Sequence, residues 1–226
     1  MKTLSSILLI SILLVSCKTD PKPSEQTIVT EKELSAADKI AEAHGFKNWS
    51  RVKELAFTFN VDKDSTHFER AYIWNTKTNE VTAMTVNDTI TYQRKQVDSL
   101  SLRADQGFIN DKFWLLPAFQ LVWDSGTTIS EPVKEQAPIS NDSLNKITLS
   151  YSNDGGYTPG DAYDFYYDEN YYIKEWIFRK GNSKEPSIIT AFSDYKTIEG
   201  LSFPTKSKKK DNNWSLYFTD IKVKTE

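Results

Sequence analysis

From Val52 onward, apolar and polar side chains alternate with a period of two, and this pattern constrains the fold more than any other feature of the sequence. Because successive side chains of a strand point to opposite faces of a sheet, such alternation is typical of a strand with one buried face. Two segments of this kind flank a polar turn at residues 62–65 and predict a β-hairpin. The alternating apolar side chains are Leu55, Phe57, Phe59 and Val61 in the first strand and Phe68, Tyr72 and Trp74 in the second.

Short segments with strand character recur as far as the C-terminus, separated by polar turns. Aromatic residues make up 13% of the chain, a usage that favours pleated, half-buried surfaces. With the first hairpin, the segments predict about ten antiparallel strands in a mainly β (α+β) domain whose sheet curls or closes. The further segments are residues 81–86, 89–94, 146–151, 163–167, 171–178, 187–193, 201–206 and 214–223.

One helix is predicted before the first strand. Ser35 and Asp38 resemble a capping box, and Gly45 is placed to end the helix in a left-handed cap. At helical spacing one face carries Leu34, Ala37, Ile40, Ala41 and His44. A cationic His44 would suit the C-terminal end of the helix dipole. Trp49 follows in a short helical turn that we expect to pack its ring onto the sheet.

Residues 108–124 are apolar without a period of two, and they interrupt the strands midway along the chain. Asn110 or Asp111 is placed to cap a helix, and Pro117 limits that helix to about two short turns. Such a segment between two sets of strands is placed to cover the concave face of the sheet. Two interpretations stay open: Trp114 and Trp123 fill the core, or they belong to a lid over a groove that accepts lipid.

The first residues predict export. Residues 1–16 contain a basic start and an apolar run at residues 7–15, which is shorter than the roughly 20 residues that cross a bilayer. Small residues before Cys17 resemble a bacterial lipobox, so we expect a signal peptide at residues 1–16 and a lipidated Cys17. Residues 17–33 are polar and contain two prolines, which predicts a flexible tether. Residues 34–226 then form one domain.

Composition and motifs exclude several classes of function. The net charge of −3 and the pI of about 5.6 give no basic surface for nucleic acid. A single cysteine and two histidines exclude a disulfide framework and a cysteine-histidine metal cluster. No phosphate-binding, dinucleotide-binding or serine nucleophile motif is present. We therefore expect no cofactor, no metal and no catalytic residue.

Three polar features have plain interpretations. His67 lies beside Glu69 on a strand, and we expect a structural or surface role. The acids Asp161, Asp164, Asp168 and Glu169 follow glycine-containing turns without the spacing of an EF-hand, which favours solvated hairpins. The basic cluster Lys206, Lys208, Lys209 and Lys210 is interpreted as a solvated hairpin tip or, alternatively, as a contact with anionic lipid head groups.

The chain resembles the LolA/LolB-like carriers of lipoproteins. The resemblance rests on residues 41–45 with Trp49, on residues 108–124, and on the strand-turn-strand segment at residues 194–205. It is closest to uncharacterised outer-membrane lipoproteins of this fold in Bacteroidota. The resemblance implies a half-open antiparallel β-barrel with an N-terminal helix and short lid helices. The Arg-Pro pair of the soluble carriers is not evident here, because Arg70 lacks the proline, so their latch residue is not assigned.

Together these features predict a non-catalytic, membrane-anchored lipoprotein of the outer membrane that faces the periplasm. In its barrel concavity it would bind an acyl chain, a lipoprotein or another amphiphile. The alternatives are a lipid or glycan hydrolase that uses Asp or Glu, and a scaffold subunit of an envelope complex. The predicted ligand-binding residues are Leu55, Phe57, Phe59, Tyr72, Trp74, Phe113, Trp114, Leu116 and Trp123.

Overall fold

The computed structural model describes residues 33–154, 157–210 and 213–226, and residues 34–226 form one compact unit. The predicted signal peptide, Cys17 and nearly all of the predicted tether lie outside the described residues. The helices are α1 (Ala36–Ala43), η1 (Phe46–Arg51), α2 (Leu102–Leu115), α3 (Pro117–Trp123) and η2 (Lys180–Asn182). The first strands are β1 (Val52–Lys63), β2 (Thr66–Asn75), β3 (Glu80–Met84) and β4 (Thr89–Gln93). After α3 follow β5 (Thr127–Ile129), β6 (Val133–Gln136), β7 (Ser143–Tyr151), β8 (Ala162–Tyr167), β9 (Ile173–Arg179), β10 (Ile188–Ser193), β11 (Lys196–Ile198), β12 (Leu201–Phe203), β13 (Lys206–Lys208) and β14 (Trp214–Thr225).

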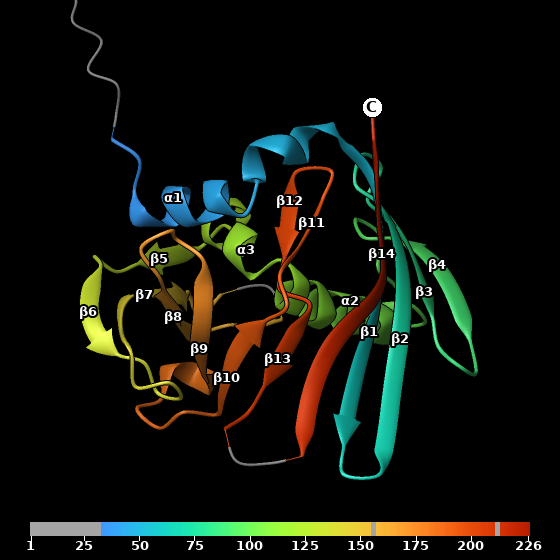
Figure 1. The fold of residues 1–226 in the computed structure, drawn as a ribbon. Helices are drawn as coiled ribbons and strands as arrows, with labels where there is room; N and C mark the ends of the chain where they lie inside the picture. Colours follow the sequence, from blue (N-terminus) through green and yellow to red (C-terminus); the bar gives the residue numbers. More distant parts are fainter. Residues whose placement is uncertain (1–32, 155–156, 211–212) are drawn as a thin grey trace, which may run out of the picture. The chain divides into compact units, whose positions relative to one another are not determined.

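Twelve strands of the described residues form a single sheet whose pairings are all antiparallel. Its order is β4-β3-β2-β1-β14-β13-β10-β9-β8-β7-β5, with β6 also paired to β7. The end strands β4 and β5 do not pair with each other, so the sheet stays open. Helices α2 and α3 lie within the curve of the sheet (Figure 1). The predicted α+β class and half-open antiparallel barrel are confirmed.

Helix α1 begins as the sequence predicts. The Ser35 hydroxyl accepts a hydrogen bond from the Asp38 amide, and the Asp38 carboxylate accepts one from the Ser35 amide. Gly45 follows the helix with a φ of 87°, in the left-handed region. A Cβ at this position would lie 1.9 Å from the carbonyl oxygen of Gly200, so the turn requires glycine.

The mid-chain helices differ from the prediction in length and in their caps. Helix α2 runs over 14 residues and starts eight residues before Asn110, so neither Asn110 nor Asp111 caps it. Its N-terminal turn is held by Asp98, whose carboxylate accepts hydrogen bonds from the amide and hydroxyl of Ser101. Pro117 begins the separate helix α3, in the first position where proline is favoured.

The second half of the sheet also differs from the prediction in two places. The short strands β5 and β6 are absent from the sequence prediction. Residues 201–206 do not form one strand: β12 ends at Phe203 and pairs only with β11, and β13 begins at Lys206 in the large sheet. Pro204 lies between them and has no amide hydrogen to donate to a ladder, which explains the break.

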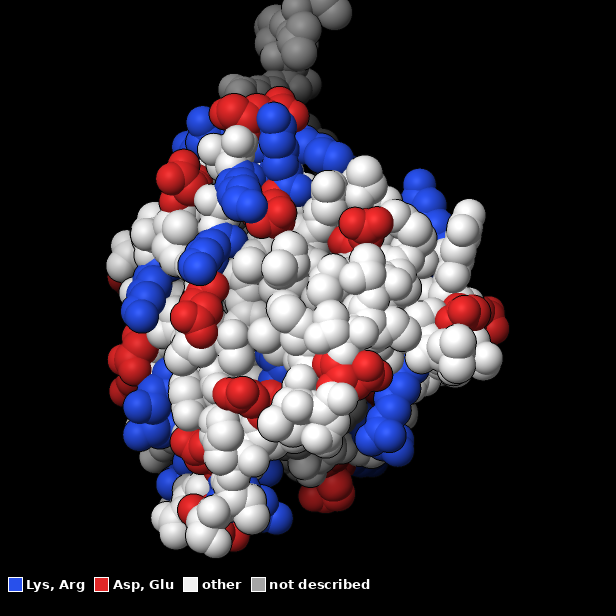
Figure 2. All heavy atoms as spheres, turned by 90° about the vertical axis from the view of Figure 1, so that its right-hand side faces the viewer, with Lys and Arg blue, Asp and Glu red and all other residues white. Residues whose placement is uncertain are grey.

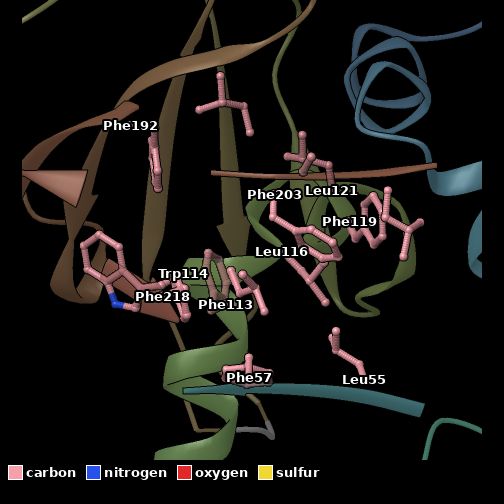
Figure 3. Close-up of a cluster of buried hydrophobic side chains, with 14 of the residues drawn as sticks. Leu55, Phe57, Phe113, Trp114, Leu116, Phe119, Leu121, Phe192, Phe203 and Phe218 are labelled. Atoms are coloured by element: carbon pink, nitrogen blue, oxygen red, sulfur yellow. The ribbon is translucent and has the colours of Figure 1, made fainter. Parts of the chain in front are cut away.

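The core lies between the sheet and the two mid-chain helices. Leu55 and Phe57 extend from β1 towards Leu116 of the α2–α3 junction and Phe119 of α3, and Phe192 and Phe218 close the cluster from β10 and β14 (Figure 3). Phe57, Phe108, Phe119 and Trp176 are at most 1% exposed. Among the described residues, we find no helix that combines the length and hydropathy needed to cross a bilayer.

Candidate ligand-binding clefts

The five predicted residues from the first hairpin lie together on the inner face of the sheet. Leu55, Phe57, Phe59, Tyr72 and Trp74 are between 0 and 6% exposed. Phe108 of α2 belongs to the segment predicted to cover this face but not to the predicted ligand-binding residues, and its ring fills the space above them. Its centroid lies 5.4 Å from that of Trp74 and 5.5 Å from that of Tyr72. The predicted concavity is therefore occupied by the protein's own side chains at this place.

The four predicted residues from the mid-chain segment pack in or against the hydrophobic core. Phe113 stacks on Tyr163 of β8 with centroids 4.5 Å apart, and Trp114 meets Trp176 of β9 edge to face at 4.4 Å. Leu116 is 2% exposed in the core. Trp123 is half-buried at the far side of α3, where its ring lies 5.2 Å from that of Trp49.

Two clefts open on different faces of α2. The first, which we call the arginine cleft, lies between α2 and strands β2–β4 and has a volume of about 690 Å³. Its apolar lining includes Phe68, Met84, Val86, Ile90, Leu100 and Ala104, and its charged lining includes Glu69, Arg70, Asp88 and Arg103. Phe68, Val86 and Leu100 are 48, 88 and 80% exposed. The side of the domain that carries β2–β4 has a broad area without charged side chains (Figure 2).

The second cleft, which we call the aromatic cleft, lies between α2 and strands β8–β10 and has a volume of about 280 Å³. Its walls are Ile109, Phe113, Trp114, Tyr163, Trp176, Phe178 and Ile188. Gln106, Asn110, Tyr157 and Thr158 complete its lining with uncharged polar groups. Of the nine predicted ligand-binding residues, Tyr72 lines the arginine cleft, and Phe113 and Trp114 line the aromatic cleft.

Two ion pairs fix α2 to the first half of the sheet, and neither is predicted from the sequence. The Arg70 guanidinium donates two hydrogen bonds to the Asp111 carboxylate, at 2.8 and 2.7 Å, and the Tyr72 hydroxyl donates a third at 2.9 Å. Burial raises the pKa of Asp111, and the charge of Arg70 opposes that rise. Nearer the start of α2, Asp105 accepts hydrogen bonds from Arg94 at 3.0 Å and from the Tyr157 hydroxyl at 2.9 Å.

Gly107 permits the close approach of α2 to β2. A Cβ at this position would lie 2.8 Å from Nη1 of Arg70 and 3.2 Å from the hydroxyl oxygen of Tyr72. Real Cβ atoms essentially never approach another atom to less than 3.0 Å, so an alanine at this position would require the Arg70 guanidinium to shift. Nη1 is not one of the two nitrogens that donate to Asp111, so the shift need not break the ion pair.

Lys112 of α2 is a buried cation without a carboxylate partner within 4.0 Å in the described part of the chain. Its side chain is 7% exposed, and Nζ lies 4.5 Å from the ring centre of Trp123 and 6.0 Å from that of Trp74. Its hydrogen bond to Oε1 of Gln120 is long, at 3.5 Å. Burial lowers the pKa of Lys112 to about 8, although Asp124 and Asp105 oppose the effect.

The histidines and the acids of the second half have structural roles. His44 is 1% exposed and its Nδ1 donates to the Ile40 carbonyl oxygen at 2.8 Å, while burial lowers its pKa to about 4. The buried ring of His44 is neutral at physiological pH, so it supplies no positive charge to the helix dipole, and its role is structural. The exposed His67 contacts Asp62 and Glu69, whose hydrogen bonds raise its pKa. Asp164 is not solvated: it is 7% exposed and forms a two-point ion pair with Arg179.

Comparison with known proteins gives distant likenesses. No protein-family model and no curated protein matches the chain. A DUF1329 family protein from Desulfovibrio piger aligns with a TM-score of 0.49 at 7% identity, over 83% of this chain and 91% of that one. A putative outer membrane lipoprotein-sorting protein domain from Vibrio parahaemolyticus aligns with a TM-score of 0.45 at 12% identity, over 84% of this chain and 94% of that one. The lipoprotein LppX of Mycobacterium tuberculosis aligns with a TM-score of 0.26 at 10% identity, over 83% of this chain and 98% of that one. At these identities and TM-scores the likenesses assign no function.

Proposed function

We propose that this protein is a membrane-anchored lipoprotein of the bacterial cell envelope, at the periplasmic side of the outer membrane, that binds an amphiphile without catalysis. The ligand is an acyl chain, the lipid part of a lipoprotein or a similar molecule. The ligand occupies a cleft beside α2, because the Phe108 ring fills the concavity above the first hairpin in which ligand binding was predicted. The kinship with Bacteroidota lipoproteins stays a prediction from the sequence.

The arginine cleft carries this proposal. Its volume of about 690 Å³ lies within the usual range of ligand sites and corresponds to about twenty groups of the size of water or a methylene. Exposed apolar side chains of three separate segments, Phe68, Val86 and Leu100, surround it. A folded protein gains nothing by presenting such groups to water at one place, so their gathering favours an apolar ligand.

The buried carboxylates support a binding function over hydrolysis. Asp105, Asp111 and Asp164 each form an ion pair with an arginine. The buried Asp161 and Glu175 instead accept hydrogen bonds from backbone amides. Glycoside hydrolysis needs two carboxyl groups that face one substrate, one of them free to donate a proton. Carboxylates that are held by guanidinium groups are suited to fixing the fold.

A displacement assay tests the binding function. A fluorescent fatty-acid analogue should bind the purified protein and should be displaced by palmitate. Ala104→Trp places a large ring in the arginine cleft and should weaken binding by about tenfold, since the apolar contact area is lost. The matched control is Val133→Trp on β6, where the side chain is 49% exposed and remote from both cleft linings. A folded protein that binds neither the analogue nor palmitate would favour the scaffold alternative.

The anchor is tested separately at Cys17. Cys17→Ser removes the only thiol of the chain and should leave the signal peptide uncleaved or release the protein from the outer-membrane fraction. Two or more acyl signals are needed for stable anchoring, so loss of the lipidated cysteine should abolish it. Unchanged fractionation would contradict the lipoprotein assignment without affecting the displacement assay.

A further inference from the structure

The two clefts beside α2 differ in charge. Glu69, Arg70, Asp88 and Arg103 contribute to the lining of the arginine cleft. None of the eleven described residues that line the aromatic cleft carries a formal charge. A carboxylate or phosphate that entered the aromatic cleft would lose water without gaining a cation from its lining, which is strongly unfavourable. The aromatic cleft is therefore suited to an uncharged ligand.

The walls of the aromatic cleft offer flat apolar surface. Phe113 and Tyr163 are stacked with an interplanar angle of 24°, and the ring centre of Phe178 lies 4.9 Å from that of Tyr163. Trp114 and Trp176 extend this surface. Rings held in this way lose little conformational entropy on binding, so they favour contact with a hydrocarbon chain.

The polar groups of the same cleft are neutral donors and acceptors. The Asn110 amide nitrogen donates to Asp111 at 2.9 Å, which orients its side chain at the cleft. Gln106 and Thr158 contribute a further amide and a hydroxyl. The amide nitrogens of Gln106 and Asn110, both on exposed residues of the lining, are the donors that a ligand carbonyl in this cleft would meet.

We propose that the aromatic cleft binds an uncharged amphiphile with an ester carbonyl and free hydroxyl groups, of the monoacylglycerol class. The inference rests on the proposed amphiphile-binding function and assigns this ligand class to a second cleft. The volume of about 280 Å³ corresponds to about nine groups of the size of a methylene, which fits a chain of medium length.

The test compares two ligands with the same chain length, 1-octanoylglycerol and octanoate, on the purified full-length protein. At pH 7.5 octanoate is ionised. Calorimetry and the fluorescence of the tryptophans should show 1-octanoylglycerol binding about tenfold more tightly than octanoate.

Two tryptophan substitutions on the same helix locate the site. Ile109→Trp fills the aromatic cleft and should weaken 1-octanoylglycerol binding by about tenfold. Ala104→Trp fills the arginine cleft and should change the affinity for 1-octanoylglycerol by less than about twofold. Ile109 and Ala104 are both half-buried, so the pair is matched in position and exposure. Ile188→Trp, which fills the same cleft from β10, replaces Ile109→Trp if that variant does not fold.

The outcomes separate this inference from the proposed function. If Ala104→Trp weakens 1-octanoylglycerol binding and Ile109→Trp does not, the ligand lies in the arginine cleft and the inference is overturned, while amphiphile binding stands. Octanoate binding as tight as 1-octanoylglycerol binding also overturns it. If neither amphiphile binds and palmitate displaces no probe, both proposals fail.

Discussion

Replacement of the buried lysine should stabilise the protein. In Lys112→Met the apolar side chain has a similar length and adapts well to a core. The fall of the lysine pKa from 10.5 to about 8 corresponds to about 3 kcal/mol that the charged group costs the folded state at neutral pH. Contact of the ammonium with Trp123 at 4.5 Å offsets about 1–2 kcal/mol of this. We expect the free energy of unfolding of Lys112→Met to exceed that of the wild type by about 1–2 kcal/mol at pH 7.

The pH dependence gives the prediction its sign. Between pH 8 and 10.5 the unfolded chain holds the Lys112 proton and the folded chain has released it, so the stability contributed by this group rises with pH. The difference in free energy of unfolding between Lys112→Met and the wild type should therefore shrink from pH 8 to pH 10.5 and should stay constant below pH 8. Urea unfolding at several pH values measures both effects, since tyrosine ionisation is common to the two proteins.

The exposed Lys95 provides the control. Lys95→Met should change the free energy of unfolding by less than about 0.5 kcal/mol and should leave its pH dependence unchanged. If Lys112→Met is less stable than wild type by about 1 kcal/mol or more at pH 7, the contact with the tryptophan rings outweighs the burial of the charge, and the reasoning is refuted.

Three further predictions concern the helices. His44 should make the protein less stable as pH falls from 6.5 to 4, by about 3 kcal/mol, because only the unfolded chain binds its proton in that window; His44→Phe should flatten this part of the urea-unfolding profile. Gly107→Ala should change the free energy of unfolding by less than about 1 kcal/mol, since a gain of about 1 kcal/mol in helix propensity offsets the shift of the Arg70 guanidinium, and a crystal structure of the variant should show Nη1 displaced from the helix. The two ion pairs of α2 oppose a lid motion, so its amides at residues 102–115 should exchange hydrogen about as slowly as those of β1, with or without a bound amphiphile; earlier exchange that a bound amphiphile slows would support a lid.

The parts of the fold that the sequence predicts are those fixed by local patterns. Ser35 and Asp38 satisfy each other within one turn, and the alternation in β1 needs no knowledge of its neighbours. The start of α2 is different, because this helix is enclosed by the sheet and carries no single apolar stripe. Asp105 and Asp111 are buried among apolar residues, and they pair with Arg94, in the turn after β4, and with Arg70 of β2. Such pairs form only in the folded chain. The sequence pattern therefore does not predict them, and it interprets Asp111 as a helix cap.

The residues of the candidate site are likewise predicted only where a local pattern fixes them. The alternation places Phe57, Tyr72 and Trp74 correctly on one face, but it does not show what fills the space above that face. Phe108 closes it because α2 begins at Leu102, eight residues before the predicted cap Asn110, so that Phe108 lies within the helix and its ring packs inward. The tertiary partners of the aromatic cleft, Tyr163 and Trp176, belong to predicted strands, yet nothing in the sequence indicates that they meet Phe113 and Trp114.

The two ion pairs of α2 determine where a ligand enters. Outward motion of the helix would have to separate Arg70 from Asp111 and Arg94 from Asp105, whose carboxylates are 0 and 3% exposed. Loss of a buried pair costs about 3–5 kcal/mol, and a total of about 5.5 kcal/mol already reduces the open form to about one molecule in ten thousand. A ligand that needed the space beneath α2 would bind with an affinity reduced by that factor. The arginine and aromatic clefts require no such motion, so binding beside the helix is favoured over binding beneath it, and Ala104→Trp and Ile109→Trp should therefore affect affinity without changing the exchange of the α2 amides.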